Sequence, residues 1–147
     1  MDSTIKEQLE IINQQMKELT GIYKTAVSNL KISENEFWIW YALINVKEEI
    51  SQQDICDMWS FSKQTVNTIV SHMVKDGYAT LEVVPGTRNR KNIHLTEKGK
   101  EFGESLIVPI FNAEVRALER IPQEERSACL KALEKYIGLL KDEIKCQ

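Results

Sequence analysis

The chain has 147 residues, of which 42% are hydrophobic and 28% are charged, a balance that is typical of a globular protein with a buried core. No apolar run approaches the ~20 residues of a membrane-spanning helix, and the first residues lack the pattern of a signal peptide. The cysteines are few and widely spaced, which predicts neither a disulfide framework nor a zinc site. They are Cys56, Cys129 and Cys146. We therefore expect a cytoplasmic protein that contains no metal and no cofactor.

The charge is unevenly distributed along the chain. The net charge is −3, which taken alone argues against a nucleic-acid partner. Residues 60–100, however, hold seven cations and three anions, a balance of +4 that leaves −7 for the rest of the chain. A basic segment in an acidic protein is the pattern expected of a DNA-binding module whose remaining surface avoids phosphate.

Residues 5–30 are predicted to form one long helix with a single narrow apolar seam. The apolar side chains recur at alternating steps of four and three residues, which is a heptad pattern. They are Ile5, Leu9, Ile12, Met16, Leu19, Tyr23, Ala26 and Leu30. A helix with one such stripe needs a partner helix to cover it.

Three helix starts in succession share the same sequence device. Each has a serine at the N-cap, an apolar residue directly before it, and a second apolar residue five positions after the first, which is a hydrophobic staple. The three sets are Ile32-Ser33 with Phe37, Ile50-Ser51 with Ile55, and Phe61-Ser62 with Val66. At Ser33, Glu36 is expected to complete a capping box. The helix over 33–47 is apolar on nearly all sides, so it is predicted to be the central buried helix.

The helix over 62–76 has one apolar and one polar face. Val66, Ile69, Val70, Met73 and Val74 fall on the side expected to face the core. The opposite face carries compact hydrogen-bonding groups and one cation: Lys63, Gln64, Asn67, Thr68, Ser71 and His72. Asn and Gln can pair with adenine and a Thr methyl can contact thymine, so this face favours base recognition over a merely solvated surface.

A basic hairpin follows this helix. Gly77 is expected to end the helix, residues 79–84 and 92–95 alternate as strands, and Pro85-Gly86 begins the turn. The tip carries Arg88, Arg90 and Lys91 and no acid, whereas a merely solubilising turn usually mixes signs. Because arginine is attracted to a narrow A·T-rich minor groove, the hairpin is predicted to be the wing of a winged helix-turn-helix.

The last part of the chain is predicted to be helical. Thr96 caps a helix in which Pro109 should produce a kink, and Pro122 separates it from a final helix over 123–144. The final helix carries two apolar stripes, Cys129, Leu133, Tyr136 and Leu140 on one and Leu130, Ile137 and Ile144 on the other. Two stripes favour two partners and hence a homodimer; the alternative is a monomeric antiparallel bundle that buries the same residues.

Three motifs in this order and spacing give the chain a resemblance to the MarR family of bacterial transcriptional regulators. They are Ser62-Lys63-Gln64-Thr65-Val66, Lys75-Asp76-Gly77-Tyr78 and Leu95-Thr96-Glu97-Lys98-Gly99. The similarity covers essentially the whole chain. It implies a homodimer with interlocked first and last helices that binds a pseudo-palindromic operator in double-stranded DNA. It also implies control by a small phenolic or other aromatic ligand, or by cysteine oxidation.

The chain departs from the family pattern at two positions. The family wing usually has Asp-x-Arg, with the Arg seven residues before the Thr of the Leu-Thr motif; here Thr87 and Asn89 occupy those positions. Arg88 and Arg90 on either side are both candidates for the minor groove, and we favour Arg90. The family's reader helix often has an Arg where this chain has Thr68, which would shift preference toward A·T-rich sites.

Other signals are expected to be structural. Cys56 lies near apolar positions, so a buried inert thiol is favoured over a redox sensor, and Cys146 is expected to be exposed. His72 and His94 stand alone at ligand spacing, which argues against a metal site. Of Trp38, Trp40 and Trp59, which could line a ligand pocket, at least one of the first two is expected in the core. No enzyme motif is present.

The sequence thus predicts a mainly α protein with a small β wing. Residues 31–99 form the DNA-binding domain, and residues 1–30 and 100–147 form a helical dimerisation region. The function expected is a dimeric DNA-binding regulator, a repressor released by a small ligand; a winged-helix protein-interaction module and a cysteine redox sensor are the alternatives. The DNA-binding residues expected are Ser62, Lys63, Gln64, Thr65, Asn67, Thr68, His72, Arg88, Arg90 and Lys91.

Overall fold

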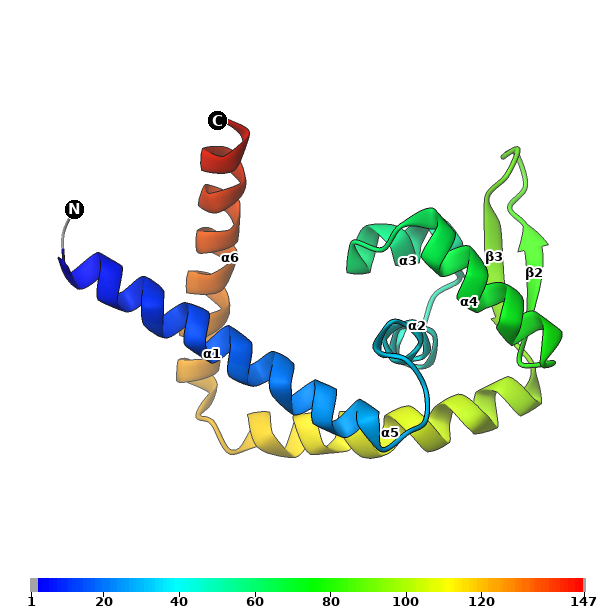
Figure 1. Ribbon diagram of the computed structural model, residues 1–147, viewed down its shortest axis with the longest axis horizontal. Coiled ribbons are helices and arrows are strands. Elements are labelled where there is room, and N and C mark those ends of the chain that lie inside the picture. Colours follow the sequence, from blue (N-terminus) through cyan, green and yellow to red (C-terminus); the bar gives the residue numbers. More distant parts are fainter. Residues whose placement is uncertain (1–2, 147) are drawn as a thin grey trace. The chain divides into compact units, whose positions relative to one another are not determined.

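The computed structural model describes residues 3–146, which form six helices and three short strands (Figure 1). In chain order the elements are α1 (Ser3–Ser28), α2 (Glu34–Asn45), β1 (Ile50–Ser51), α3 (Gln52–Trp59), α4 (Lys63–Lys75), β2 (Ala79–Val83), β3 (Lys91–Leu95), α5 (Glu97–Glu119) and α6 (Gln123–Lys145). The chain falls into two compact units, the first ending at Val108 and the second beginning at Pro109. No helix within residues 3–146 is long and apolar enough to cross a membrane. The predicted fold class, mainly α with a small β wing, is confirmed.

The core of the first unit is centred on α2. Phe37, Ile39 and Trp40 have no exposed surface, which confirms the prediction of a central buried helix. In Figure 1 this helix is seen end-on, between the α3–α4 pair and the first half of α5. Gly103 allows α5 to pack closely against α2, because a Cβ at this position would lie 2.7 Å from both Trp40 and Ile44.

All three serine N-caps form as predicted. Each serine hydroxyl accepts the backbone N–H three residues on, at Ser33, Ser51 and Ser62. The capping box predicted with Glu36 is wrong, because the Glu36 carboxylate instead accepts the indole N–H of Trp40 at 3.3 Å. A capping box forms around Ser51, where the fourth residue of the box is an aspartate.

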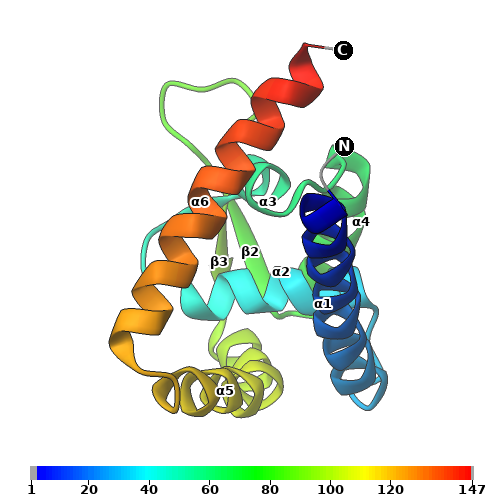
Figure 2. The ribbon, with the colours of Figure 1, turned by 90° about the vertical axis from the view of Figure 1, so that its left-hand side faces the viewer.

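The sheet is antiparallel with the strand order β1-β3-β2. Ile50 pairs with Ile93, and Leu81 pairs with the same residue from the other side. The sequence predicted the two strands of the hairpin but not β1, which is only two residues long and overlaps the N-cap of α3. The loop that joins β2 and β3 extends past the end of the sheet (Figures 1 and 2).

The two motifs at the ends of the hairpin interlock. Gly77 adopts a positive φ and ends α4 in a Schellman motif, in which its N–H donates to the carbonyl of Val74. Thr96 donates to the carbonyl of Gly77 at 2.6 Å and accepts the N–H of Gly99, so it caps α5 as predicted. A Cβ at Gly99 would lie 1.8 Å from the carbonyl oxygen of Tyr78. The Lys-Asp-Gly-Tyr and Leu-Thr-Glu-Lys-Gly motifs therefore form one junction at the base of the hairpin.

The second unit contains the end of α5 and α6. Helix α5 continues through Pro109, and α6 begins after Pro122 without a side-chain cap. None of the described residues of α6 is buried. Its apolar side chains, including Leu130 and Ile144, lie exposed.

Candidate nucleic-acid interface

Helix α4 presents the predicted polar face to solvent. Of the apolar residues expected to face the core, Val66, Val70 and Met73 are buried and Ile69 is half-buried. The prediction is wrong for Val74, which lies near the end of the helix and is exposed. The residues expected to contact DNA along this helix are exposed, except that Thr65 is half-buried. The exposed ones are Ser62, Lys63, Gln64, Asn67, Thr68 and His72. The face is therefore held rigidly from behind by the core and is open in front.

The N-terminus of α4 uses two of the predicted residues for capping. The Ser62 hydroxyl accepts the Thr65 N–H at 3.1 Å and donates to the Thr65 hydroxyl at 2.8 Å. Lys63 and Gln64 lie in the same first turn, and their side chains remain exposed. Ser62 and Thr65 thus fix the start of the helix, while the side chains of Lys63 and Gln64 remain free to reach a ligand.

A cleft of about 630 Å³ separates the start of α4 from the hairpin loop. Its walls are polar and positively charged, and they come from α3, α4 and the loop. The lining residues are Gln52, Gln53, Cys56, Lys63, Gln64, Asn67, Asn89, Arg90 and Lys91. The cleft thus brings together three predicted residues of α4 and two of the hairpin, with cations on both walls. Such a surface suits a polyanion.

The hairpin loop is closed by its own hydrogen bonds. The N–H of Val84 donates to the carbonyl of Arg90 at 2.7 Å, and the Thr87 hydroxyl donates to the carbonyl of Val84 at 2.7 Å. Gly86 adopts a φ of 78°, which only glycine reaches without strain. The side chains of Arg88, Arg90 and Lys91 are all exposed.

Arg90 forms an ion pair with Asp54 in α3. Its Nη2 donates to Asp54 Oδ1 at 2.5 Å, while Asp54 Oδ2 accepts the N–H of Ser51 at 2.8 Å. Burial raises the pKa of Asp54, but the hydrogen bonds from Ser51 and the charge of Arg90 together outweigh this effect. They hold the pKa of the carboxyl below its ordinary value, so Asp54 is ionised at neutral pH.

Two polar contacts of the hairpin were not predicted from the sequence. Asp54 was not among the expected site residues, although its place three residues after Ser51 is a capping-box position. His94 was expected to stand alone, but its Nε2 lies 2.9 Å from Glu82 Oε2 on the neighbouring strand. Both pairs are distant in sequence, so no local spacing points to them.

An aromatic cluster lies on the other side of α2 from Trp40. Trp38 stacks on Trp59 with ring centroids 4.8 Å apart, and Tyr41 and Tyr23 contact Trp38 edge-on or tilted. The Nε1 of Trp59 is buried and has no hydrogen-bond partner among the described residues. Trp40 is fully buried, which confirms that one of the first two tryptophans belongs to the core.

Cys56 and Cys146 lie where they were expected. Cys56 lines the cleft and is buried, with 7% of its surface exposed, and Cys146 is exposed.

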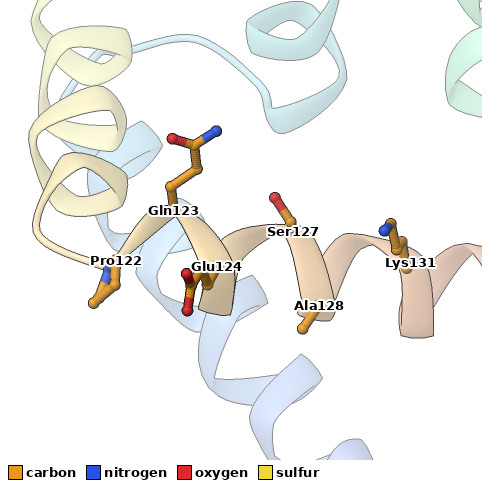
Figure 3. A pocket seen from close by; sticks show the side chains of 6 residues that line it. All are labelled: Pro122, Gln123, Glu124, Ser127, Ala128 and Lys131. Carbon is orange, nitrogen blue, oxygen red and sulfur yellow. The ribbon is translucent and has the colours of Figure 1, made fainter.

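The hollow at the start of α6 does not form a comparable site. It measures about 800 Å³, and its lining side chains project from a single helix and its cap (Figure 3). They are Pro122, Gln123, Glu124, Ser127, Ala128 and Lys131. Since no second element of the unit closes it, this hollow is a surface depression.

The comparisons with known proteins agree with this geometry. A family model described as MarR family matches residues 31–88, from the start of the α2 region to the hairpin loop. No curated protein sequence matches the chain at a significant level.

Solved structures share the fold over nearly the whole chain. The MarR family regulator NMB1585 from Neisseria meningitidis has a TM-score of 0.80 at 17% identity, with 94% of this chain and 96% of that one covered. Staphylococcus aureus MepR in a DNA-binding conformation has a TM-score of 0.70 at 20% identity, with coverage of 92% and 98%. Staphylococcus aureus MarR in complex with salicylate and kanamycin has a TM-score of 0.70 at 13% identity, with 97% of this chain and 95% of that one covered. The family match over residues 31–88 makes this part of the chain similar to the MarR family, and the chain shares its fold with solved MarR family regulators.

Proposed function

We propose that the protein is a homodimeric repressor that binds a pseudo-palindromic operator and is released from it by a small aromatic ligand. In this proposal α4 enters the major groove and the hairpin loop enters the adjacent minor groove. The wing is the hairpin loop over residues 85–91.

The observation that carries the DNA-binding part is the cleft between α4 and the wing. Lys63 stands on one wall, and Arg90 and Lys91 stand on the other. Gln64 and Asn67 also line the cleft, and their side-chain amides can bind base edges. A surface that combines cations with side-chain amides can hold the phosphate backbone and read the bases.

The exposed apolar stripes support the homodimer. Helix α1 exposes Ile5, Leu9, Met16 and Leu19 of its heptad seam, and α6 exposes Leu130, Leu133, Ile137, Leu140 and Ile144. Large apolar surfaces that remain open on a single chain mark sites of association. A second copy with the same stripes offers a matching surface, as a two-fold interface requires.

An aromatic effector is supported by the Trp38–Trp59 stack and by one related structure. The stack offers flat apolar faces, and the buried Trp59 N–H is a donor that lacks a partner among the described residues. Staphylococcus aureus MarR, which shares this fold, was solved with salicylate. Salicylate is therefore the probe with which to begin, and it should reduce the affinity of the wild-type protein for its selected duplex.

DNA binding is tested with a duplex selected from a random library by the wild-type protein. Asn67→Ala should cost about 1–3 kcal/mol on that duplex, because it removes a base contact, and should leave binding to random DNA unchanged. Lys63→Ala should weaken binding to all duplexes and reduce the salt dependence by about one ion. Lys141→Ala on α6 is the matched cation control. If no duplex is bound at low salt, or if all three variants behave alike, the proposal is wrong.

A further inference from the structure

We propose that the two arginines of the wing have different tasks. Arg90, with Asp54, is a positioning residue that fixes the wing against α3, and Arg88 is the cation that enters the minor groove. This assignment rests on the proposed function and reverses the preference for Arg90 drawn from the sequence.

Arg90 is held at both its side chain and its backbone. The guanidinium donates to Asp54 Oδ1, and the carbonyl accepts the N–H of Val84 across the loop at 2.7 Å. Asp54 is itself fixed, because its second carboxylate oxygen accepts the N–H of Ser51 at the start of α3. The chain from Ser51 to Arg90 thus joins the capping box of α3 to the closing hydrogen bond of the wing.

A second bond ties the base of the wing to the same region. Asn92 Nδ2 donates to Glu49 Oε2 at 3.0 Å, just before β1. Arg90 and Asn92 are two residues apart at the start of β3. Their partners, Asp54 and Glu49, both lie at or just before the start of α3. Because α3 packs against α4, the two contacts set the height of the wing relative to the helix that reads the major groove.

The residues after the tip border the cleft beside α4, and Arg88 does not. Asn89, Arg90 and Lys91 line the cleft, whereas Arg88 is not part of its lining. Among residues 3–146, the exposed Arg88 side chain has no hydrogen-bond or ion-pair partner. An arginine with no carboxylate partner can enter a narrow groove without first breaking an ion pair, so Arg88 is the better reader.

The closing experiment separates groove reading from positioning. The probe is the duplex selected by the wild-type protein, with the A·T pairs under the wing replaced by I·C or by G·C. These two pairs present the same major groove, but only G·C places an amino group in the minor groove. We expect wild-type protein to prefer the I·C duplex by about tenfold, within the usual cost of one mismatched pair.

The variants should then differ in this preference. Arg88→Ala should bring the ratio of the two affinities close to one. Arg90→Ala and Asp54→Asn should lower both affinities several-fold and leave the ratio near the wild-type value. The Asn side chain still has an oxygen to accept the Ser51 N–H, so Asp54→Asn removes the ion pair while keeping the cap.

A DNA-free measurement checks the positioning role. Amide hydrogen exchange at Val84, whose N–H bonds to the Arg90 carbonyl, should accelerate in Arg90→Ala and in Asp54→Asn by a similar factor, and not in Arg88→Ala. If Arg90→Ala lost the preference for the I·C duplex and Arg88→Ala kept it, the assignment of the two arginines would be overturned, but the proposed function would not. A wild-type ratio of one would overturn minor-groove reading by either arginine, and failure to bind any duplex would overturn the proposed function as well.

Discussion

The first unit, up to Val108, closes its own core, whereas α6 in the second unit does not. The buried apolar side chains run from Val27 to Ile107, and Phe37, Ile39 and Trp40 of α2 are fully enclosed. Helix α6 is 23 residues long and has no buried residue within its described part. The same chain therefore contains one region whose stability is intrinsic and one whose apolar side chains need a further surface to cover them.

The ends of the helices differ in the same way. Helices α2, α3 and α4 each begin at a serine whose hydroxyl accepts a backbone N–H, and α4 ends in a Schellman motif. Helix α6 follows Pro122 with no side-chain cap. An uncapped helix without tertiary burial is only marginally stable in water. The difference supports the proposed homodimer, in which the first unit would be folded beforehand and α6 would gain stability through association.

Trp40→Ala should have the largest effect on folding. It empties the centre of the first unit, where the ring contacts Tyr78 and Phe102, and should cost about 3–5 kcal/mol in the free energy of unfolding. Chemical denaturation at several protein concentrations is the measurement. A loss below about 1 kcal/mol would mean that α2 is not the centre of an intrinsic core.

Leu133→Glu should abolish association and leave the first unit folded. The charge would lie on the exposed stripe of α6, where a dimer interface cannot bury it without a partner. In light scattering the wild-type protein should have twice the 17.0 kDa mass of the chain, and the variant should have the single mass. Lys131→Glu on the same helix is the control for charge. A wild-type mass of 17.0 kDa at micromolar concentration would contradict the prediction.

Two glycine substitutions should change stability in opposite directions. Gly99→Ala would place a Cβ 1.8 Å from the Tyr78 carbonyl and should destabilise the first unit by about 1–3 kcal/mol. Gly138→Ala in α6 meets no atom within 4 Å and should stabilise the helix by about 0.5–1 kcal/mol. The two melting temperatures, measured under one condition, test the comparison directly. Shifts of the same sign would contradict it.

The smallest effect expected is the pH dependence of the Asp54–Arg90 pair. Since the folded-state pKa of Asp54 is lowered, the pair stabilises the fold at pH values above the ordinary carboxyl pKa of ~3.9. That contribution is lost as the pH falls through the lowered folded-state value. For a pair this exposed, it is worth about 0.2–1 kcal/mol. The stability difference between wild type and Asp54→Asn should therefore shrink between pH 7 and pH 3, and a constant difference would contradict the prediction.

Much of the first unit could be predicted because the sequence patterns that specify its helices and turns are local. The serine caps, the two faces of α4 and the turn at Gly77 each depend on residues within one or two helical turns. Backbone hydrogen bonding and side-chain periodicity act over that range, so the residue pattern alone specifies them. The exposed positions of the predicted residues on α4 followed from the same periodicity.

The remaining features were decided by tertiary structure. Asp54 and Arg90 are 36 residues apart, so only the packing of the hairpin beside α3 brings them together. Glu82 and His94 are 12 residues apart and meet through the register of β2 and β3. Glu36 stands at the capping-box position after Ser33, but its carboxylate accepts the indole N–H of the buried Trp40, a tertiary contact that the local pattern does not contain. The sequence by itself determined which polar residues face outward on α4. Only the tertiary structure decided which wing arginine is held by a carboxylate, because an ion pair between distant residues depends on how the elements pack.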